Sequence, residues 1–383
     1  MLYPTLIAIS SLSIVLFVLS VWRATRRTPY PAQECPISVL KPLCGADEAL
    51  EGNLETFFTQ DHPCYELVFG VEGASDPAIA VVERLRERYP DVRSRLIVHN
   101  GGRALNPKVS NLRAMLSAGS HDVVVISDSN VSVDPGYLSN MSAHLHSDSE
   151  VGLVTNLIAG IGEETLGATL ENLHLNGTIA GSVAASQELG DHTLVIGKSM
   201  MFRRSVLEAI GGLESVATIL AEDYVIGRMF RQAGYKVRIA DGLIRNVNQA
   251  TTVKRFFDRQ LRWGMLRWRL KPFAFPAEVL INPITLAALA PFFGVTGPLP
   301  LLWAIVATFI RDGISWARLR GTAGLVHALP FALVKDALML LVLFVAPCKR
   351  HVTWRGNRLR ISSGTRLYAE RPSADAPHVL VER

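Results

Sequence analysis

The chain has 383 residues, of which 49% are hydrophobic and only 19% charged, and its mean hydropathy is +0.24. That length suits one large domain or two ordinary ones, but the composition is too apolar for a wholly soluble protein. The net charge is +5, from 39 basic and 34 acidic residues. No basic run interleaved with aromatic residues indicates nucleic-acid binding, so we interpret the positive charge as attraction to a membrane surface.

The N-terminal segment predicts a membrane anchor. Residues 1–22 contain no charged side chain, and residues 6–22 nearly reach the roughly 20 apolar residues that cross a bilayer. Arg23, Arg26 and Arg27 follow the apolar run, whereas a secretory signal peptide carries its basic residues first. The positive-inside rule therefore predicts an anchor with its N-terminus outside and the following chain in the cytoplasm.

A second apolar zone lies near the C-terminus. Residues 279–310 carry no charge and are interrupted by GPLP at 297–300, which predicts a hairpin turn between two spans. A third run, residues 325–347, is split by Lys335 and Asp336, which we expect to face a bundle interior or to mark the end of a span.

The basic tail conflicts with a simple count of spans. One anchor plus three later spans places the tail outside, whereas the positive-inside rule places it inside. Either one late segment is re-entrant or interfacial, or the rule fails, and the sequence leaves both open. The tail's basic residues, which have no acidic partner among them, are Lys349, Arg350, Arg355, Arg358, Arg360 and Arg366.

Between the membrane zones, short apolar runs alternate with helical patterns. We predict strands at residues 36–43, 65–71, 95–98 and 122–127. Helices are expected after Asp47, from Pro77 and over residues 108–117. Alternating buried strands and helices predict an α/β domain with a mostly parallel, open sheet covered on both faces. Ligands of such sheets bind beyond the C-terminal ends of the strands.

Two short stretches resemble nucleotide-binding loops, but each lacks a glycine that the loop requires. GKS at residues 197–199 resembles the end of a Walker loop, but His192 stands where that loop needs a glycine. GIG at residues 160–162 has Thr165 where a dinucleotide loop needs its third glycine. A kinase and a dehydrogenase are therefore disfavoured.

The four cysteines suggest no special chemistry. They form neither a C-x-x-C pair nor a zinc spacing, and a cytoplasmic domain keeps thiols reduced. We interpret them as packing residues: Cys35, Cys44, Cys64 and Cys348.

Three acidic positions lie at predicted strand ends or helix starts, and each has a structural alternative. Asp76 follows the second strand and equally suits an N-cap for the helix that begins at Pro77. Asp128 ends the most hydrophobic strand, where a carboxylate either caps a turn or holds magnesium or manganese. Glu222 and Asp223 precede a helix, whose dipole favours acidic residues in the first turn.

Arginine and tryptophan gather just before the second membrane zone. Arg259, Arg262 and Trp263 fall on one face if residues 252–270 form a helix. Guanidinium groups bind phosphate oxygens in pairs, and an indole ring covers a sugar or lies at the bilayer interface. The alternative is a juxtamembrane helix that binds lipid headgroups, which also suits Arg267 and Arg269.

The order of these motifs resembles one family, the membrane-anchored inverting glycosyltransferases similar to ceramide glucosyltransferase. Its series of an isolated aspartate, a single-Asp or D-x-D site, an E-D pair and [Q/R]-x-x-R-W is similar to Asp76, Asp128, Glu222–Asp223 and the RQLRW run. The likeness covers nearly the whole chain. One departure is Asn130 in place of the second aspartate of D-x-D, so a cation would have one protein carboxylate plus the donor's phosphates. The other similar stretches are ISVLKPL at 37–43, NLETFF at 53–58, DPAI at 76–79, NPK at 106–108 and WRG at 354–356.

The resemblance implies a Rossmann-like GT-A domain and a role for each motif. Asp223 is the expected general base, and a divalent cation, magnesium or manganese, is expected at Asp128. The implied partners are a UDP-sugar donor, a membrane lipid acceptor and the bilayer, with no nucleic acid. Trp263 and Trp268, with the apolar residues 178–185, are expected to admit a lipid tail, although a core helix suits that stretch equally. The residues implied in donor binding are Asp76, Lys108, Asp128, Glu222, Arg259, Arg262 and Trp263.

These inferences give an expected function and layout. We expect transfer of a hexose from a UDP-sugar to the primary hydroxyl of a membrane lipid, with inversion to a β-glycoside. Glucose is the first candidate for the hexose, and ceramide is the first candidate for the lipid. The alternatives are a hopanoid glycosyltransferase that uses UDP-N-acetylglucosamine and a non-catalytic nucleotide-sensing membrane scaffold. We expect a multi-pass protein of a bacterial inner membrane with its catalytic domain in the cytoplasm. The expected divisions are an anchor at 1–30, the catalytic domain at 31–250, an interfacial helix at 251–277, membrane segments at 278–347 and a basic tail at 348–383.

Overall fold

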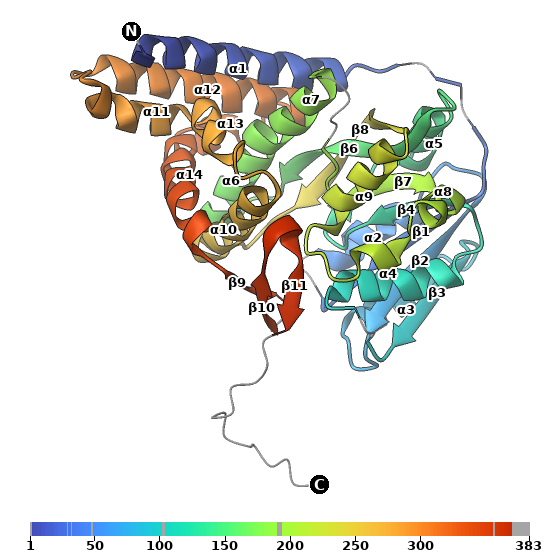
Figure 1. The fold of residues 1–383 in the computed structure, drawn as a ribbon. Helices are drawn as coiled ribbons and strands as arrows, with labels where there is room; N and C mark the ends of the chain where they lie inside the picture. The colour runs from blue at the N-terminus through green and yellow to red at the C-terminus, as the bar shows by residue number, and fades with distance from the viewer. Residues whose placement is uncertain are drawn as a thin grey trace, which may run out of the picture.

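A computed structural model describes residues 2–28, 30–31, 33–46, 49–101, 104–189, 194–354 and 357–369. An eight-stranded sheet forms the centre of its α/β domain, and apolar helices lie along one end (Figure 1). In spatial order the strands are β3 (Ser94–His99), β2 (Tyr65–Glu72), β1 (Ile37–Pro42), β4 (Val123–Ser127), β7 (Ser199–Arg203), β6 (Val151–Ile161), β8 (Lys236–Val247) and β5 (Val131–Ser132).

The four predicted strands form one parallel part of the sheet, and β6 and β8 pair in parallel as well. β1 pairs with β2 and β4, and β2 pairs with β3, all in parallel register. Every residue of β1 and of β4 is buried, as expected for strands covered on both faces. The expected fold class, a mostly parallel Rossmann-like domain with apolar helices at both ends, is confirmed. The antiparallel partners that the sequence did not indicate are β7, between β4 and β6, and the edge strand β5.

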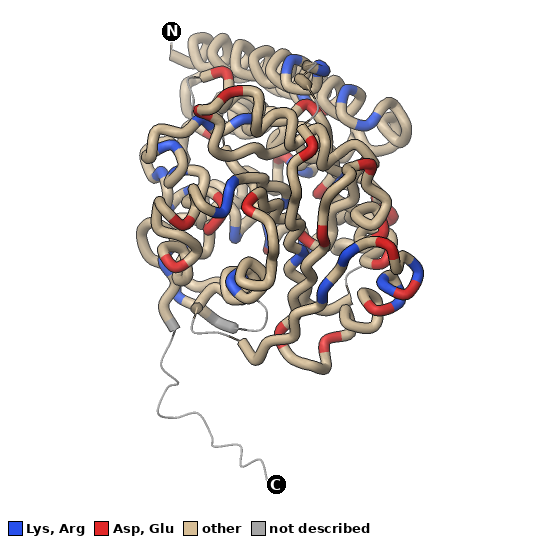
Figure 2. Tube along the Cα trace, turned by 90° about the vertical axis from the view of Figure 1, so that its right-hand side faces the viewer, with Lys and Arg blue, Asp and Glu red and all other residues tan. Residues whose placement is uncertain are grey.

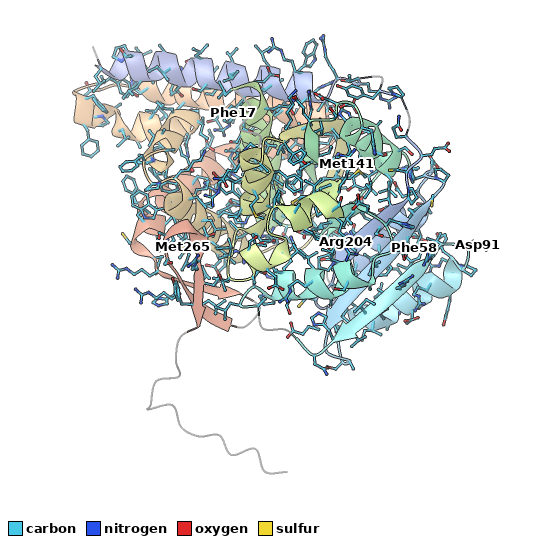
Figure 3. All side chains as sticks on the ribbon, turned by 45° about the vertical axis from the view of Figure 1, so that its right-hand side comes forward. Phe17, Phe58, Asp91, Met141, Arg204 and Met265 are labelled. Carbon is cyan, nitrogen blue, oxygen red and sulfur yellow. The ribbon has the colours of Figure 1, made fainter. Side chains whose placement is uncertain are left out.

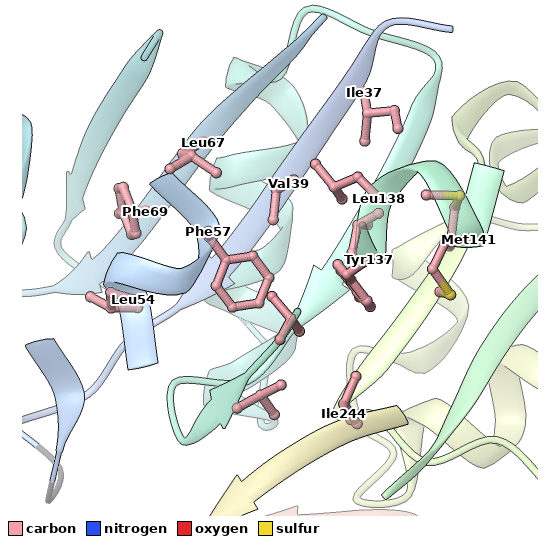
Figure 4. Packing of buried hydrophobic residues seen from close by; sticks show 14 of the residues in the cluster. Ile37, Val39, Leu54, Phe57, Leu67, Phe69, Tyr137, Leu138, Met141 and Ile244 are labelled. Carbon is pink, nitrogen blue, oxygen red and sulfur yellow. The ribbon is translucent and has the colours of Figure 1, made fainter. Parts of the chain in front are cut away.

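Helices cover both faces of the sheet because each buries one apolar stripe. On one face Phe57 lies against Tyr137, with ring centroids 5.9 Å apart (Figure 4). The expected capping residue Asp47 lies outside the described residues, and α2 begins after Ala49. The helices of that face are α2 (Leu50–Phe58), α3 (Ala78–Arg88) and α5 (Tyr137–Leu145), and those of the other face are α4 (Pro107–Ala118), α8 (Arg204–Ala209) and α9 (Glu222–Gln232).

Three helices are long and apolar enough to cross a membrane, so the chain is membrane-associated. They are α1 (Leu2–Ala24), α12 (Leu299–Arg320) and α14 (Phe331–Cys348). Figure 2 shows the N-terminal helix without charged residues over most of its length. The segment expected to be the anchor therefore forms a continuous helix.

The segment expected to be the first of two spans joined at GPLP is not one straight helix. The chain there forms the 3-10 helix η3 (Phe275–Ile281), then α11 (Pro283–Leu289) and η4 (Ala290–Phe293), with a 98° bend between η3 and the pair that follows. Pro283 lacks a backbone N–H and restricts Asn282, so a continuous helix is blocked at this point. This segment is a broken span or a re-entrant loop.

The membrane helices are fixed to the catalytic domain by close contacts. A continuous helical run of α6 (Leu166–Leu173), the π-helix η1 (His174–Ile179) and α7 (Ala180–Glu188) joins the two. Phe17 of α1 packs on α7 (Figure 3), where a Cβ added at Gly181 would lie 2.5 Å from its ring. At the end of α12, Arg320 donates to Glu163 at 2.8 Å. The helix α10 (Val253–Leu270), where the sequence predicted one, packs on α14 and α6.

The basic tail lies on the catalytic-domain side. After α13 (Leu325–Ala328) and α14, the chain forms a three-stranded antiparallel sheet of β9 (His351–Trp354), β10 (Asn357–Ile361) and β11 (Leu367–Ala369). The backbone N–H of Leu367 donates to the carbonyl of Thr218, 2.7 Å away, and that of Leu220 donates to Thr365. This placement agrees with the positive-inside rule and with a late segment that does not cross. Arg355 and Gly356 of the WRG stretch lie outside the described residues.

Two further expectations have clear outcomes. Lys335 and Asp336 are fully buried and face the interior of the helix bundle, as predicted. The interpretation of the cysteines as packing residues is wrong for Cys44, Cys64 and Cys348, which are exposed. Cys35 is half-buried.

Candidate active site

A polar cavity of about 400 Å³ opens beyond the end of β4. It brings together residues from four parts of the chain that the sequence analysis had singled out. Because the carboxyl ends of parallel strands meet at one edge, this is where a ligand of the sheet is expected. The predicted site residues that line it are Lys108, Asp128, Glu222, Asp223, Arg259, Arg262 and Trp263.

Local structure explains how the charged residues reach this cavity. Asp128 follows the last residue of β4 directly. Asn106 caps α4 by accepting a hydrogen bond from the N–H of Val109, and this places Lys108 in the first turn. Glu222 and Asp223 form the first turn of α9, where the helix dipole stabilises negative charge.

Lys108 lies between two carboxylates. Its ammonium nitrogen is 2.8 Å from Oδ1 of Asp128 and 3.2 Å from Oε1 of Glu222. Burial disfavours the charged lysine, but these carboxylates outweigh it and raise its pKa above the ordinary value. For Asp128, burial is likewise outweighed by the nearby ammonium groups, chiefly that of Lys108, and its pKa is lowered. Lys108 and Asp128 therefore stay ionised together.

Asp223 is held in a fixed orientation by backbone donors. The N–H of Gly197 donates to Oδ2 at 2.6 Å, and the N–H of Tyr224 donates to Oδ1 at 2.7 Å. Burial raises the pKa of Asp223 above its usual value, against the opposing effect of Lys108 and these two donors. Burial also raises the pKa of the neighbouring Glu222. A carboxylate with a raised pKa is a stronger base than a free one.

Two lysines in the same cluster were not predicted as site residues. Lys198 donates to Oδ1 of Asn130 at 2.8 Å and lies 3.7 Å from Oδ2 of Asp128. Lys41, fully buried, donates to the backbone carbonyl of Asp128 at 2.6 Å. Burial lowers the pKa of both lysines. Lys198 had been noted only within the failed Walker motif, and Lys41 sits inside a strand pattern that carries no signal of a site.

The two arginines of α10 have different surroundings. Arg259 forms an ion pair with the buried Glu171, 3.1 Å away, and Gln260 also donates to that carboxylate. Arg262 lines the polar cavity, and among the described residues it has no ion pair or hydrogen bond. Burial and the nearby Arg259 lower the pKa of Arg262. Arg262 is therefore the guanidinium of this motif that remains available to a phosphate group.

The chain's own residues do not fit a resident divalent cation. Both oxygens of Asp128 face ammonium groups, and Asn130, which replaces a second aspartate, accepts from Lys198. Within the described ranges, no group of three or more His, Cys, Asp or Glu side chains is placed to hold a metal ion. The lysines supply the positive charge that a cation brings to other carboxylate sites.

Asp76 lies apart from the polar cavity. Its carboxylate accepts hydrogen bonds from the N–H of Gly45 at 3.0 Å and from the N–H of Ala78 at 2.8 Å. It thus fixes the loop after β1 to the start of α3, which matches the capping alternative. Its expected contact with the donor stays a prediction.

A second, mostly apolar cavity of about 380 Å³ adjoins the first. Its walls come from η1, α7, α10, the broken segment η3–α11 and α14. Thr178 and Val183, from the apolar stretch singled out in the sequence, line it. Asp223 and Trp263 line both cavities. A polar compartment and an apolar compartment beside the membrane helices therefore meet at the half-buried carboxylate of Asp223.

Comparisons with known proteins agree on one family. The model of glycosyl transferase family 21 matches residues 3–367. Ceramide glucosyltransferase 1 of Caenorhabditis elegans is 26% identical over 388 residues, which cover 96% of this chain and 80% of that protein. Ceramide glucosyltransferase 3 of the same organism is 30% identical over 244 residues, 64% of this chain and 53% of its own length.

Among solved structures, one similar fold is the mannosyltransferase PcManGT from Pyrobaculum calidifontis, solved in complex with GDP-Man and Mn²⁺. The TM-score is 0.45 and the identity 20%, over 91% of this chain and 87% of that one.

Proposed function

The chain belongs to glycosyl transferase family 21 and is a sugar-transferring enzyme, and from that premise we propose its substrates and mechanism. The proposed reaction transfers a hexose from a UDP-sugar to the primary hydroxyl of a membrane lipid. Glucose is the first candidate for the hexose, and ceramide is the first candidate for the lipid. The new linkage is β, formed with inversion. The expected non-catalytic scaffold is set aside because the family and the relatives are enzymes.

One observation carries this proposal: Asp223 and Trp263 line both cavities. A soluble, charged donor requires a polar compartment, and a lipid acceptor requires an apolar one beside the membrane. Group transfer between the two requires a base where they meet. Asp223 has that position and a raised pKa.

The donor's pyrophosphate is assigned to the polar cavity. Lys108, Lys198 and Arg262 line this space, and Lys108 is paired with Asp128. As the bond between the anomeric carbon and the phosphate oxygen breaks, negative charge develops on UDP. Fixed cations in a water-poor site stabilise that charge without reorganisation. We propose that Glu222 orients Lys108 through their ion pair. Arg259 holds α10 against Glu171 in the same way.

The acceptor hydroxyl is assigned to the boundary between the cavities. Its oxygen forms a bond to the anomeric carbon on the face opposite to the leaving UDP, so the configuration inverts. The hydroxyl proton passes to Asp223, whose orientation is fixed by Gly197 and Tyr224. No step is derived through a divalent cation; the expectation that magnesium or manganese joins Asp128 through the donor's phosphates stays a prediction.

The proposed location is a bacterial inner membrane with the catalytic domain in the cytoplasm. Arg23 lies in the last turn of α1 and Arg26 follows that helix, both on the catalytic-domain side, and the basic tail lies on that same side. The positive-inside rule supports a cytoplasmic side for both.

The test offers purified protein in detergent a panel of UDP-sugars with ceramide and with a hopanoid polyol, and identifies the products by mass spectrometry. Asp223→Asn should lower kcat by about 10²- to 10⁴-fold. Binding of UDP, measured by calorimetry, should remain within about twofold, because the amide keeps the size of the carboxylate.

The matched control is Asp122→Asn. Asp122 is an exposed carboxylate that accepts from Ser205, away from both cavities. This variant should transfer sugar at the wild-type rate. An Asp223→Asn protein with wild-type kcat would remove Asp223 as the base.

A further inference from the structure

The apolar cavity contains polar atoms that have no partner within the protein. Two residues that line it carry three buried side-chain atoms with no hydrogen bond among the described residues: Nδ1 and Nε2 of His174 and Oγ1 of Thr285. His174 is 2% exposed and Thr285 is 1% exposed. An unsatisfied buried polar atom costs free energy, so its persistence beside a cavity indicates a ligand that satisfies it.

The charged groups on the same walls are already paired. Arg267 binds Glu278 through two nitrogens, at 2.6 and 3.2 Å. Arg311 binds Asp336 at 2.8 Å, and Asn282 donates to the backbone carbonyl of Asp336 at 3.0 Å. Among the buried side chains on these walls, the unpaired hydrogen-bonding atoms therefore belong to His174 and Thr285, and the half-buried Thr178 and Ser182 add hydroxyl groups to the same cavity.

The backbone conformation at His174 is also unusual. His174 begins the π-helix η1, a form that is rare and often marks functional positions. One side of its ring meets Phe256 edge to face, with centroids 6.5 Å apart. Gly177, one turn on, allows α12 to approach closely, because a Cβ there would lie 2.1 Å from Oδ1 of Asp312. The histidine is thus held in place by packing and not by hydrogen bonds.

The chemistry of the two side chains limits the ligand. Burial, together with the charges of Lys335, Arg267 and Arg311, lowers the pKa of His174 well below its usual value, so the ring is neutral. A neutral imidazole offers one donor and one acceptor, and a threonine hydroxyl offers both. These atoms complement an amide or a hydroxyl. A phosphate group would find no unpaired cation here, since Arg267 and Arg311 are both neutralised.

We propose that His174 and Thr285 form an acceptor-selectivity site that hydrogen-bonds a neutral amide or hydroxyl of the lipid, a group distinct from the hydroxyl that receives the sugar. This inference rests on the proposed function, because it treats the apolar cavity as the acceptor site. The acceptor class is an uncharged amphiphile with a second polar group near its head. A phosphorylated lipid is excluded from this cavity.

The test compares two acceptors in detergent micelles, ceramide and a 2-alkyl-1-alkanol with the same chain lengths but neither amide nor second hydroxyl. The wild type should use ceramide with a kcat/KM at least about tenfold higher. His174→Phe and Thr285→Val should each lower this ratio by about fivefold to tenfold, because the loss falls more on ceramide than on the alkanol, which has no amide or second hydroxyl for these side chains to bind. His174→Gln, which keeps a donor and an acceptor, should recover most of the ratio.

Each remaining outcome decides one question. Equal use of both acceptors by the wild type overturns the proposal even if no variant folds, while sugar transfer itself stands. A ratio unchanged in both variants overturns it as well. If the wild type glycosylates neither lipid, nor a hopanoid polyol in a third arm, the proposed function fails instead. Preference for the polyol over ceramide identifies the bound group as a hydroxyl and supports the site.

Discussion

The ammonium nitrogen of Lys108 lies 2.8 Å from Oδ1 of Asp128, in the polar cavity and nine-tenths buried. The same nitrogen contacts Glu222 at 3.2 Å. One cation thus compensates two carboxylates that lie far apart in the chain. Removing it leaves those charges in a partly dry site, where an unpaired charge is costly.

Lys108→Met should therefore destabilise the protein by about 3 kcal/mol, measured by thermal unfolding in detergent. UDP binding should weaken in parallel, because the freed carboxylates repel the pyrophosphate. Lys254→Met is the control, since Lys254 is exposed and pairs with Asp258 on the surface of α10. An Lys108→Met protein as stable as this control would contradict the argument.

Cation removal provides a second test. Because lysines already hold Asp128, UDP should still bind after chelation with EDTA, with a loss of affinity smaller than that caused by Lys198→Met. That substitution should weaken binding at least about tenfold, since it removes a charged hydrogen-bond donor from the cavity. Titration calorimetry with and without chelator measures both effects. Complete loss of UDP binding with EDTA would contradict this argument and would support the prediction of a divalent cation at Asp128.

The raised pKa of Asp223 predicts the pH dependence of transfer. A base acts in its ionised form, so kcat/KM should fall as the pH drops through the pKa of Asp223. That pKa lies above the ordinary aspartate value, and the acid limb should therefore begin above about pH 4. Initial rates across a pH series at low acceptor concentration measure it. An acid limb within the ordinary aspartate range would contradict the assignment.

The raised pKa of Asp223 also affects how the stability of the fold depends on pH. The direction is opposite to that for a salt-bridged carboxylate, whose pKa is lowered. A raised folded pKa means that the native state favours the protonated form, so this contribution to stability is present at low pH and lost as the pH rises through the folded pKa. Asp223→Asn resembles the protonated form. The melting temperature of the wild type relative to this variant should therefore fall as the pH rises from about 4 to neutral.

Sequence patterns predicted four of the parallel strands and residues at strand ends and helix starts that line the polar cavity, because those positions depend on local periodicity and on one rule about sheet edges. Lys198 could not be predicted in the same way. It reaches Asp128 because β7 runs antiparallel to β4 and pairs Ser199 with Ser127. Strand pairing of this kind is a tertiary choice that leaves no periodic signal.

The membrane part shows a similar limit. The charge-free length of α1 was enough to predict a continuous helix, but the 98° break after η3 depends on Pro283 and on packing against α1. Hydropathy alone cannot separate a straight span from a broken one. No sequence pattern indicated that the side chain of His174 is unpaired, since its burial without a hydrogen-bond partner is seen only in the structure.

The two arginines of α10 should differ on substitution. Arg262→Lys should lower kcat/KM for the donor by about a hundredfold with little loss of stability, because a lysine cannot make the bidentate phosphate contact. Arg259→Lys should mainly lower the melting temperature, since its partner Glu171 is buried. Steady-state rates and thermal unfolding of both variants separate the two effects. Equal kinetic losses would mean that both guanidinium groups contact the donor.

The buried charges between the membrane helices form a balanced set. Lys335 lies 2.5 Å from Oδ2 of Asp312, and Arg311 binds both Asp312 and Asp336, all four at most 1% exposed as whole residues. Two positive and two negative groups compensate one another without water. This arrangement supports a structural role in the bundle.

A double-mutant cycle on Lys335 and Asp312 tests this role. Lys335→Met should cost about 3 to 5 kcal/mol, because Asp312 loses one of its two partners in a dry environment. Lys335→Met combined with Asp312→Leu should be less destabilised than the sum of the single variants, since the pair is removed as a unit. Thermal unfolding in detergent gives the energies. Strictly additive losses would mean that the two groups do not stabilise each other, and the bundle would then depend on Arg311 and Asp336 alone.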